Sequence, residues 1–213
     1  MFFSSDMCLD IHQQLIEHVN YCDVAKQYLV YRNGLPARGF YYVAQGLVGL
    51  YQVSENGKET LLRIYGPGAY FGYRSLFTEQ YYPSTARAML DSKIVHINVN
   101  DFTALEKIAP SLANRLMREV CEELGEAEKR LMQFNAFSAK KRILDTIYYM
   151  FDTYPEYPWT YREIGEFSGS DTTTVIRYCK KLKQAGLLEA KSRKPLPVDL
   201  DQLANFRKSL LSV

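Results

Sequence analysis

A chain of 213 residues is long enough for two small domains, each with its own hydrophobic core. Its 47% hydrophobic and 23% charged residues are typical of globular proteins, and it has no apolar run near the roughly 20 residues of a membrane span. The net charge of +2 is unevenly distributed. Residues 1–137 carry 13 basic and 15 acidic side chains, whereas residues 138–213 carry 13 and 9, an excess that favours contact with phosphate.

The N-terminus and the cysteines predict a cytoplasmic protein without a metal centre. The first residues show neither a basic leader nor a long apolar segment. Cys8, Cys22, Cys121 and Cys179 form no CxxC pair, and such scattered cysteines are typical of reduced thiols. The three histidines do not combine into a metal-binding motif. We therefore expect no metal, no resident cofactor and no membrane partner.

The N-terminal half is predicted to change from helix to strand. Residues 1–27 form a short helical lead-in with apolar residues at Leu9, Ile11, Leu15, Ile16 and Val19. From Tyr28 to about Val99 the chain is rich in glycine, tyrosine and β-branched residues. Its strand-like runs are residues 40–46, 47–53, 59–66 and 93–99, with turn signals at Ser54–Lys58 and Gly66–Gly68. These features predict an antiparallel barrel or roll.

The segment after Pro110 predicts a long helix with an apolar seam. Apolar residues recur at alternating steps of four and three: Ala113, Met117, Val120, Leu124, Ala127, Leu131 and Phe134. Three such heptads, flanked by charged residues, are typical of a two-stranded coiled coil. We expect a dimer interface with a second copy of the chain, formed by Met117, Val120, Leu124, Ala127 and Leu131. The alternative is a helix that folds back on its own barrel.

A boundary is predicted near Phe137–Ser138. Ser138 can cap a helix over residues 139–151, and Pro155 and Pro158 exclude a helix in the segment that follows. The expected domains are residues 1–109 (the roll), 110–137 (the long helix) and 138–213.

Residues Thr160–Glu189 predict a helix-turn-helix. Thr160 and Glu163 have the spacing of a capping box, and Gly169 supplies the turn. Asp171 is expected to cap the second helix, whose inner face carries Val175, Tyr178 and Leu182. The outer face of this helix is polar and basic: Thr172, Thr173, Arg177, Lys180 and Lys181.

That outer face suits the major groove of DNA, where hydroxyl and guanidinium groups contact base edges. The alternative is an amphipathic helical hairpin with a solvated basic face. A small wing is expected after the second helix, and residues 199–211 are expected to form a last amphipathic helix.

A roll, a long helix and a helix-turn-helix in this order resemble the Crp/Fnr family of bacterial transcription regulators. Three motifs carry the resemblance: GFYYVAQGLVGLY from Gly39, GPGAYFGYRSLF from Gly66 with STARA from Ser84, and the helix-turn-helix from Thr160. The second of these is similar to the family's phosphate-binding cassette.

The resemblance implies an α+β fold, with an antiparallel cyclic-nucleotide-binding-like β-roll as sensor domain, a dimerisation helix and a C-terminal winged helix-turn-helix. It implies a homodimeric regulator that is not an enzyme and binds a near-palindromic operator in double-stranded DNA, with RNA polymerase as a further partner.

The resemblance places the ligand pocket at the cassette: Gly72, Tyr73, Arg74, Pro83, Ser84 and Thr85. Members that bind cyclic AMP have a glutamate and an arginine where this chain has Tyr73 and Pro83. A cyclic phosphate would therefore lose a charge-assisted pair. We expect that cyclic AMP does not bind in the usual way and that the effector is an unknown small molecule. The alternative is a cyclic-nucleotide-responsive regulator with a non-standard pocket, in which Arg74 or Arg63 holds the anion.

The resemblance also assigns roles in the helix-turn-helix. Thr172 and Thr173 stand where cyclic-AMP-type members carry Arg-Glu for base contact, and Arg177 matches the second base-reading arginine. Lys180 matches a basic position near the DNA backbone. The remaining candidates for phosphate contact or helix capping are Thr160, Tyr161, Asp171 and Thr174. A cupin-like metalloenzyme is excluded because His96 is the only histidine after residue 18.

Overall fold

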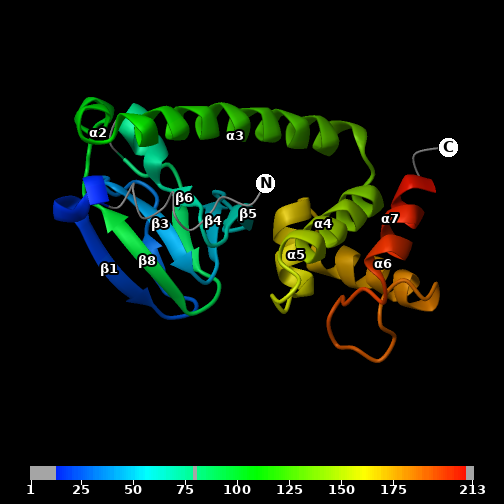
Figure 1. The fold of residues 1–213 in the computed structure, drawn as a ribbon. Coiled ribbons are helices and arrows are strands. Elements are labelled where there is room, and N and C mark those ends of the chain that lie inside the picture. The colour runs from blue at the N-terminus through cyan, green and yellow to red at the C-terminus, as the bar shows by residue number, and fades with distance from the viewer. Residues whose placement is uncertain (1–12, 79–80, 210–213) are drawn as a thin grey trace. The chain divides into compact units, whose positions relative to one another are not determined.

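The computed structural model describes residues 13–78 and 81–209. The chain forms two compact units, residues 1–126 and 127–213. Helix α3 (Pro110–Ala136) begins in the first unit and ends in the second, as Figure 1 shows.

The first unit contains the predicted antiparallel roll. One sheet has the strand order β1-β8-β3-β6 and the other β2-β7-β4-β5, and every pairing is antiparallel. The strands are β1 (Val19–Val24), β2 (Leu29–Tyr31), β3 (Phe40–Gln45), β4 (Val48–Val53), β5 (Glu59–Tyr65), β6 (Tyr70–Phe71), β7 (Thr85–Ala88) and β8 (Ser92–Ile97). The four strand-like runs of the sequence correspond to β3, β4, β5 and β8. The hairpin between β4 and β5 turns at Gly57, whose φ of 78° favours glycine.

The helical lead-in is wrong at its C-terminal end. Ile16–His18 is a short 3-10 helix, η1, and Val19 begins β1 opposite Ile97 of β8. The apolar spacing indicated a helix, but the backbone of β8 would otherwise lack a partner along this edge, and pairing satisfies it. Leu15 is fully buried in the roll's core. Leu9 and Ile11 lie outside the described residues.

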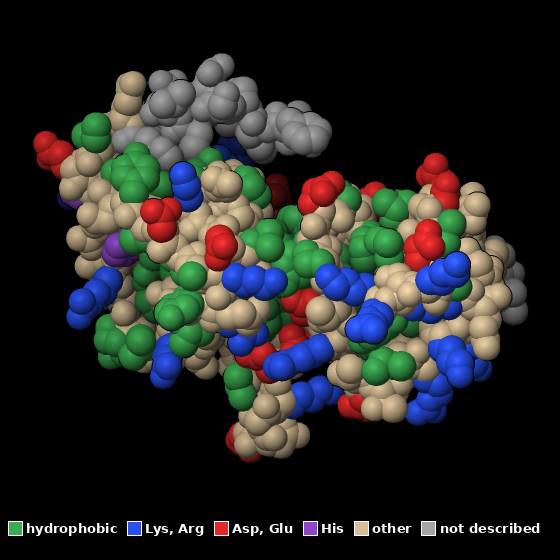
Figure 2. Space-filling model, turned by 90° about the horizontal axis from the view of Figure 1, so that it is seen from below, with side chains coloured by type: hydrophobic (Ala, Val, Ile, Leu, Met, Phe, Trp, Pro, Cys, Tyr) green, Lys and Arg blue, Asp and Glu red, His purple; other side chains and the backbone are tan. Residues whose placement is uncertain are grey.

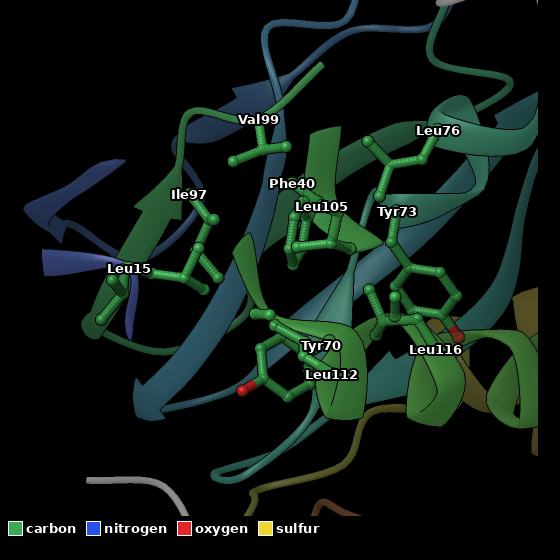
Figure 3. Packing of buried hydrophobic residues seen from close by; sticks show 13 residues of the cluster. Leu15, Phe40, Tyr70, Tyr73, Leu76, Ile97, Val99, Leu105, Leu112 and Leu116 are labelled. Carbon is green, nitrogen blue, oxygen red and sulfur yellow. The ribbon is translucent and has the colours of Figure 1, made fainter. Parts of the chain in front are cut away.

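The core of the first unit joins the roll to helices. Helix α2 (Phe102–Ile108) and the first turns of α3 contribute Leu105, Leu112, Ala113 and Leu116 to a buried cluster that includes strand residues such as Phe40. Figure 3 shows these leucines facing the aromatic and aliphatic side chains of the sheet. Burial of each leucine side chain contributes about 1.5–3 kcal/mol. The start of α3 is thereby fixed to the roll.

The second unit is helical. Its elements are the end of α3, α4 (Ala139–Thr153), α5 (Tyr161–Ser168), α6 (Thr172–Gln184) and α7 (Leu200–Ser209). Ser138 caps α4 by accepting a hydrogen bond from the Lys141 N–H, and residues 154–160 are not helical, as predicted. Trp159 is fully buried, and its indole N–H donates to the carbonyl oxygens of Met150, at 3.0 Å, and Tyr154.

The helix-turn-helix is formed by α5 and α6. The Thr160–Glu163 capping box begins α5, and Gly169 ends it with φ = 65°, both as predicted. The wing is a loop closed by an antiparallel bridge between Leu188 and Pro197. The α+β architecture with a β-roll, a long helix and a C-terminal winged helix-turn-helix is thus confirmed.

Candidate nucleic-acid interface, dimer seam and ligand pocket

Burial fixes the rotation of α6 about its axis. Val175, Tyr178, Cys179 and Leu182 are buried against the rest of the second unit. The opposite face exposes four of the predicted DNA-binding residues: Thr172, Thr173, Arg177 and Lys180. The structure therefore brings these four side chains onto one solvent-facing surface.

The other three predicted contacts lie at helix starts. The Thr160 hydroxyl donates to Glu163 Oε2, at 2.7 Å, and accepts from the Glu163 N–H, so its first role is to cap α5. Tyr161 and Thr174 are half-buried in the first turns of α5 and α6. Asp171 occupies the N-cap position of α6, but its side chain accepts no capping hydrogen bond, which corrects the expected cap.

The wing adds basic residues that the sequence-based site did not include. Lys191, Arg193 and Lys194 are exposed in the loop between the two bridged positions. Lys183 of α6 donates to the Ser192 carbonyl and so fixes this loop to the helix. Figure 2 shows Lys and Arg side chains over the surface of this unit. The signal in the sequence was the cluster of cations after Glu189.

Cys179 should be chemically protected in the folded chain. Burial raises the pKa of its thiol to about 12, and only a thiolate reacts readily with alkylating reagents. We expect iodoacetamide at mildly alkaline pH to modify the exposed Cys22 and Cys121, and Cys179 only after unfolding in urea. Peptide mass spectrometry measures this. Native labelling of Cys179 at the rate of Cys121 would contradict the buried orientation of α6.

The structure divides the apolar seam of α3 into three parts. Ala113 is buried in the core of the roll, and Val120 packs partly against it. Met117, Leu124 and Leu131 are exposed by 41%, 60% and 63% of their surface. Ala127 is exposed as well. The folded-back alternative thus describes the start of the helix, while the middle of the seam is open.

The end of the seam contacts the helix-turn-helix. A Cβ atom on Gly169 would lie 2.5 Å from Phe134 Cε1, so the glycine allows the phenyl ring to approach the turn. Arg130 donates to the Phe167 carbonyl and Arg142 to the Ser168 carbonyl, both at the C-terminus of α5. Cations at this position stabilise the last carbonyls of a helix. The last turns of α3 therefore form one unit with the helix-turn-helix.

The predicted pocket residues lie at the start of a short 3-10 helix, η2 (Tyr73–Phe77), and around the start of β7. Gly72 precedes η2 with φ = 78°. Tyr73 and Ser84 are buried, whereas Arg74 and Pro83 are exposed. Thr85 accepts a hydrogen bond from the Asn33 N–H. The residue in place of the family's arginine is thus a proline directed to solvent.

Aromatic rings fill the interior of the roll beside these residues. Tyr31 stacks on Tyr82 with ring centroids 3.9 Å apart, and both rings are buried. Phe71 stacks on Tyr41 and Tyr31. The Tyr82 hydroxyl donates to the Gly39 carbonyl and accepts from the Arg38 N–H. This packing fixes the Tyr82 ring and leaves it no freedom to stack on a ligand without displacement.

Arg63, which was a candidate to bind an anionic ligand, is directed to α3. Its guanidinium donates to Glu126 Oε2 at 2.7 Å and to the Glu123 carbonyl oxygen at 3.1 Å, and its Nε lies 3.6 Å from Glu123 Oε1. These acidic partners correct the idea that Arg63 is available to a ligand. Arg74 remains the exposed cation of the motif.

Over residues 13–78 and 81–209, no three His, Cys, Asp or Glu side chains are grouped as metal ligands. Among the helices of those ranges, none has both the length and the apolar character of a membrane span.

Comparison with known proteins agrees with this architecture. The family model of the cyclic nucleotide-binding domain matches residues 22–107. An uncharacterized protein of Haemophilus influenzae is 35% identical over 116 residues, which are 52% of this chain and 90% of the relative. The cyclic AMP receptor protein of Thermus thermophilus is 26% identical over 75% of this chain and 74% of its own length.

A solved structure of a CRP/FNR-family transcriptional regulator, also from Thermus thermophilus, has a TM-score of 0.75 at 24% identity. The alignment covers 89% of this chain and 98% of that one. This solved Thermus thermophilus protein is named as a transcriptional regulator, and regulators of this family are not enzymes. The roll, the long helix and the helix-turn-helix, together with these relatives, show that the chain belongs to the Crp/Fnr family of transcription regulators.

Proposed function

We propose that the chain is a sequence-specific DNA-binding regulator that acts as a homodimer. The observation that carries this proposal is the outward face of α6, where Thr172, Thr173, Arg177 and Lys180 are exposed while the opposite face is buried. A helix with hydroxyls at its N-terminal end and cations along it suits the major groove. The cations of the wing are placed to contact phosphates beside that groove.

Each side chain of the outward face has a proposed role. Arg177 presents a planar fork that matches the two acceptors of guanine. Thr172 and Thr173 offer hydroxyls to bases and a methyl group to thymine. Lys180 and the wing residues Lys191, Arg193 and Lys194 contact the backbone. Thr160, Tyr161 and Thr174 position the two helix starts near phosphates.

The dimer would form through the seam residues Met117, Val120, Leu124, Ala127 and Leu131, of which Val120 is half-buried. Two copies would then place two α6 helices in successive major grooves, about 34–36 Å apart, on a near-palindromic operator. In functional terms, residues 1–109 form the sensor, 110–137 the dimerisation helix and 138–213 the DNA-binding domain. Bound to such an operator in the cytoplasm, the dimer would act on transcription through RNA polymerase.

Cyclic AMP is not expected as the effector in the usual binding mode. Tyr73 and Pro83 replace the two polar clamps of the family motif, and stacked rings occupy the interior. The match of residues 22–107 to the cyclic nucleotide-binding domain favours one alternative, a cyclic nucleotide held in a non-standard pocket near Arg74. Calorimetry with cyclic AMP and cyclic GMP distinguishes the two: saturable heat would support the alternative.

The direct test is selection of bound duplexes from random DNA. We expect a near-palindromic consensus whose affinity falls steeply with salt, because lysine and arginine contacts release counterions from the phosphates. Recovery of random sequences, or of a single half-site without symmetry, would contradict the proposal.

Arg177→Ala should lower discrimination at one base pair of each half-site by about 1–3 kcal/mol. The matched control is Arg177→Lys, which keeps the charge but loses the two-pronged donor. We expect both variants to lose preference at that base pair and the lysine variant to keep more of the non-specific affinity. Gel-shift titrations on the selected operator and on single-base variants measure both quantities. Unchanged base preference in Arg177→Ala would refute the assigned role.

A further inference from the structure

A carboxylate of α3 reaches into the cassette of the roll. Glu123 lies midway along α3, and only 13% of its side chain is exposed. The Tyr65 hydroxyl, at the end of β5, donates to Glu123 Oε1 at 3.0 Å. Arg63, also on β5, pairs with the same oxygen and with the backbone carbonyl of Glu123.

The phenol of Tyr73, in the cassette, feels the charge of the same carboxylate. Burial, followed by the charges of Glu123 and Glu119 and a hydrogen bond with Glu123, raises the pKa of Tyr73 far above its ordinary value. Burial and the charge of Glu123 also raise the pKa of Tyr65. Both phenols therefore keep their protons, and the Tyr65 hydroxyl acts as the donor to Glu123. Tyr73 occupies the position where cyclic-AMP-binding relatives carry the glutamate that holds the ribose.

The charges around Glu123 are paired. Arg63 also bonds Glu126, and Arg115 bonds Glu119 within α3 at 2.8 Å. The carboxylate of Glu123 therefore has a cation and a phenolic donor beside it, which is the environment that a buried anion requires.

These contacts are of the kind that an anionic effector would have to supply. An effector shifts a conformational equilibrium only through contacts that differ between the two states. Contacts between the roll and α3 can differ between two states in this way, because they fix the position of α3 on the roll. In this chain, Arg63 and Tyr65 make such contacts with Glu123.

We propose that Glu123 is a built-in anionic ligand of the roll, which holds α3 in its DNA-binding arrangement without a small-molecule effector. This inference rests on the proposed DNA-binding function. The packed rings support it independently, because the buried rings of Tyr31, Phe71 and Tyr82 stack on one another in the interior of the roll. The regulator would then be controlled by its abundance or by a partner.

The test compares Glu123→Ala with Glu122→Ala in the full chain. Both changes remove a carboxylate from α3 and introduce the best helix former, but Glu122 is exposed. Tyr73→Phe is a milder variant that removes one donor and keeps the ring. Operator affinity is measured by fluorescence anisotropy without effector and with saturating cyclic AMP or cyclic GMP. Deuterium uptake of β5 and η2 reports directly on the contact.

We expect wild-type chain and Glu122→Ala to bind the operator equally well with and without cyclic nucleotide. Glu123→Ala should bind at least tenfold more weakly and take up deuterium faster in β5 and η2, and Tyr73→Phe should show a smaller change in the same direction. Wild-type binding that requires a cyclic nucleotide, or Glu123→Ala with wild-type affinity, would overturn the built-in ligand alone. Wild-type chain that binds no selected DNA under either condition would overturn the proposed function as well.

Discussion

Leu124→Glu is expected to convert the chain from a dimer to a monomer. The seam of α3 leaves Leu124 exposed by 60% in the single chain, and a second copy would bury it. A glutamate at this position would place two carboxylates against each other in an apolar interface, where neither has a cation. We expect these two charges to raise the dissociation constant of the homodimer at least 100-fold, which corresponds to about 2.7 kcal/mol.

The matched control for this variant is Met132→Glu. Met132 is also an exposed apolar residue of α3, with 51% of its surface accessible, but it lies one position outside the heptad seam. Light scattering over a concentration series should show a dimer for Met132→Glu and a monomer for Leu124→Glu, with the same helix content by circular dichroism. If Leu124→Glu stays dimeric, the proposed interface lies elsewhere.

Loss of the dimer should also weaken binding to the two-half-site operator. A monomer has one α6 helix and can contact one half-site, so Leu124→Glu should lose the gain in affinity that comes from linking two half-sites. The operator affinity of the monomer should match that of the dimer for an isolated half-site. This comparison separates loss of dimerisation from damage to the reading helix.

Trp159→Ala is expected to destabilise the second unit by about 3–5 kcal/mol, the usual cost of truncating a buried aromatic side chain. Trp159 is fully buried, and its ring contacts Tyr157 with centroids 4.3 Å apart. Its N–H also satisfies the Met150 and Tyr154 carbonyls near the end of α4. The residue directly precedes the Thr160 cap, so its loss should also loosen the start of α5.

Urea unfolding followed by circular dichroism measures this effect, and alkylation of Cys179 reports on the second unit specifically. Trp159→Phe is the control, because it keeps an aromatic ring and loses the N–H. We expect it to cost less than half as much as alanine. A loss below about 1 kcal/mol for Trp159→Ala would show that the site collapses around the cavity.

Most of the architecture follows from local chemistry in the sequence. Asn56-Gly57 determines the hairpin of β4 and β5, because glycine adopts the positive φ that the turn requires. Thr160 and Glu163 determine the start of α5 by reciprocal hydrogen bonds between residues three apart. The spacing of Val175, Tyr178 and Leu182 predicts which face of α6 is buried, and hence which face is available to DNA.

The sequence was less informative where a partner came from a distant segment. The lead-in was expected to be helical over residues 1–27, but Val19–Val24 pairs with the edge of β8 as a strand. The heptad pattern of α3 has the same period at Ala113 and at Leu124. Only the folded chain shows that the roll buries the first and leaves the second exposed.

By itself, therefore, the sequence determined the elements, their order and the polar face of the reading helix, because these depend on interactions between residues a few positions apart. The tertiary structure decided that Arg63 and Tyr65 meet the carboxylate of Glu123 in α3, about 60 residues further along the chain. The spacing of apolar residues along the sequence indicates on which face of its own helix or strand a side chain lies. Which group it meets there depends on how separate elements pack, and that is decided by the burial and hydrogen bonding of the whole unit.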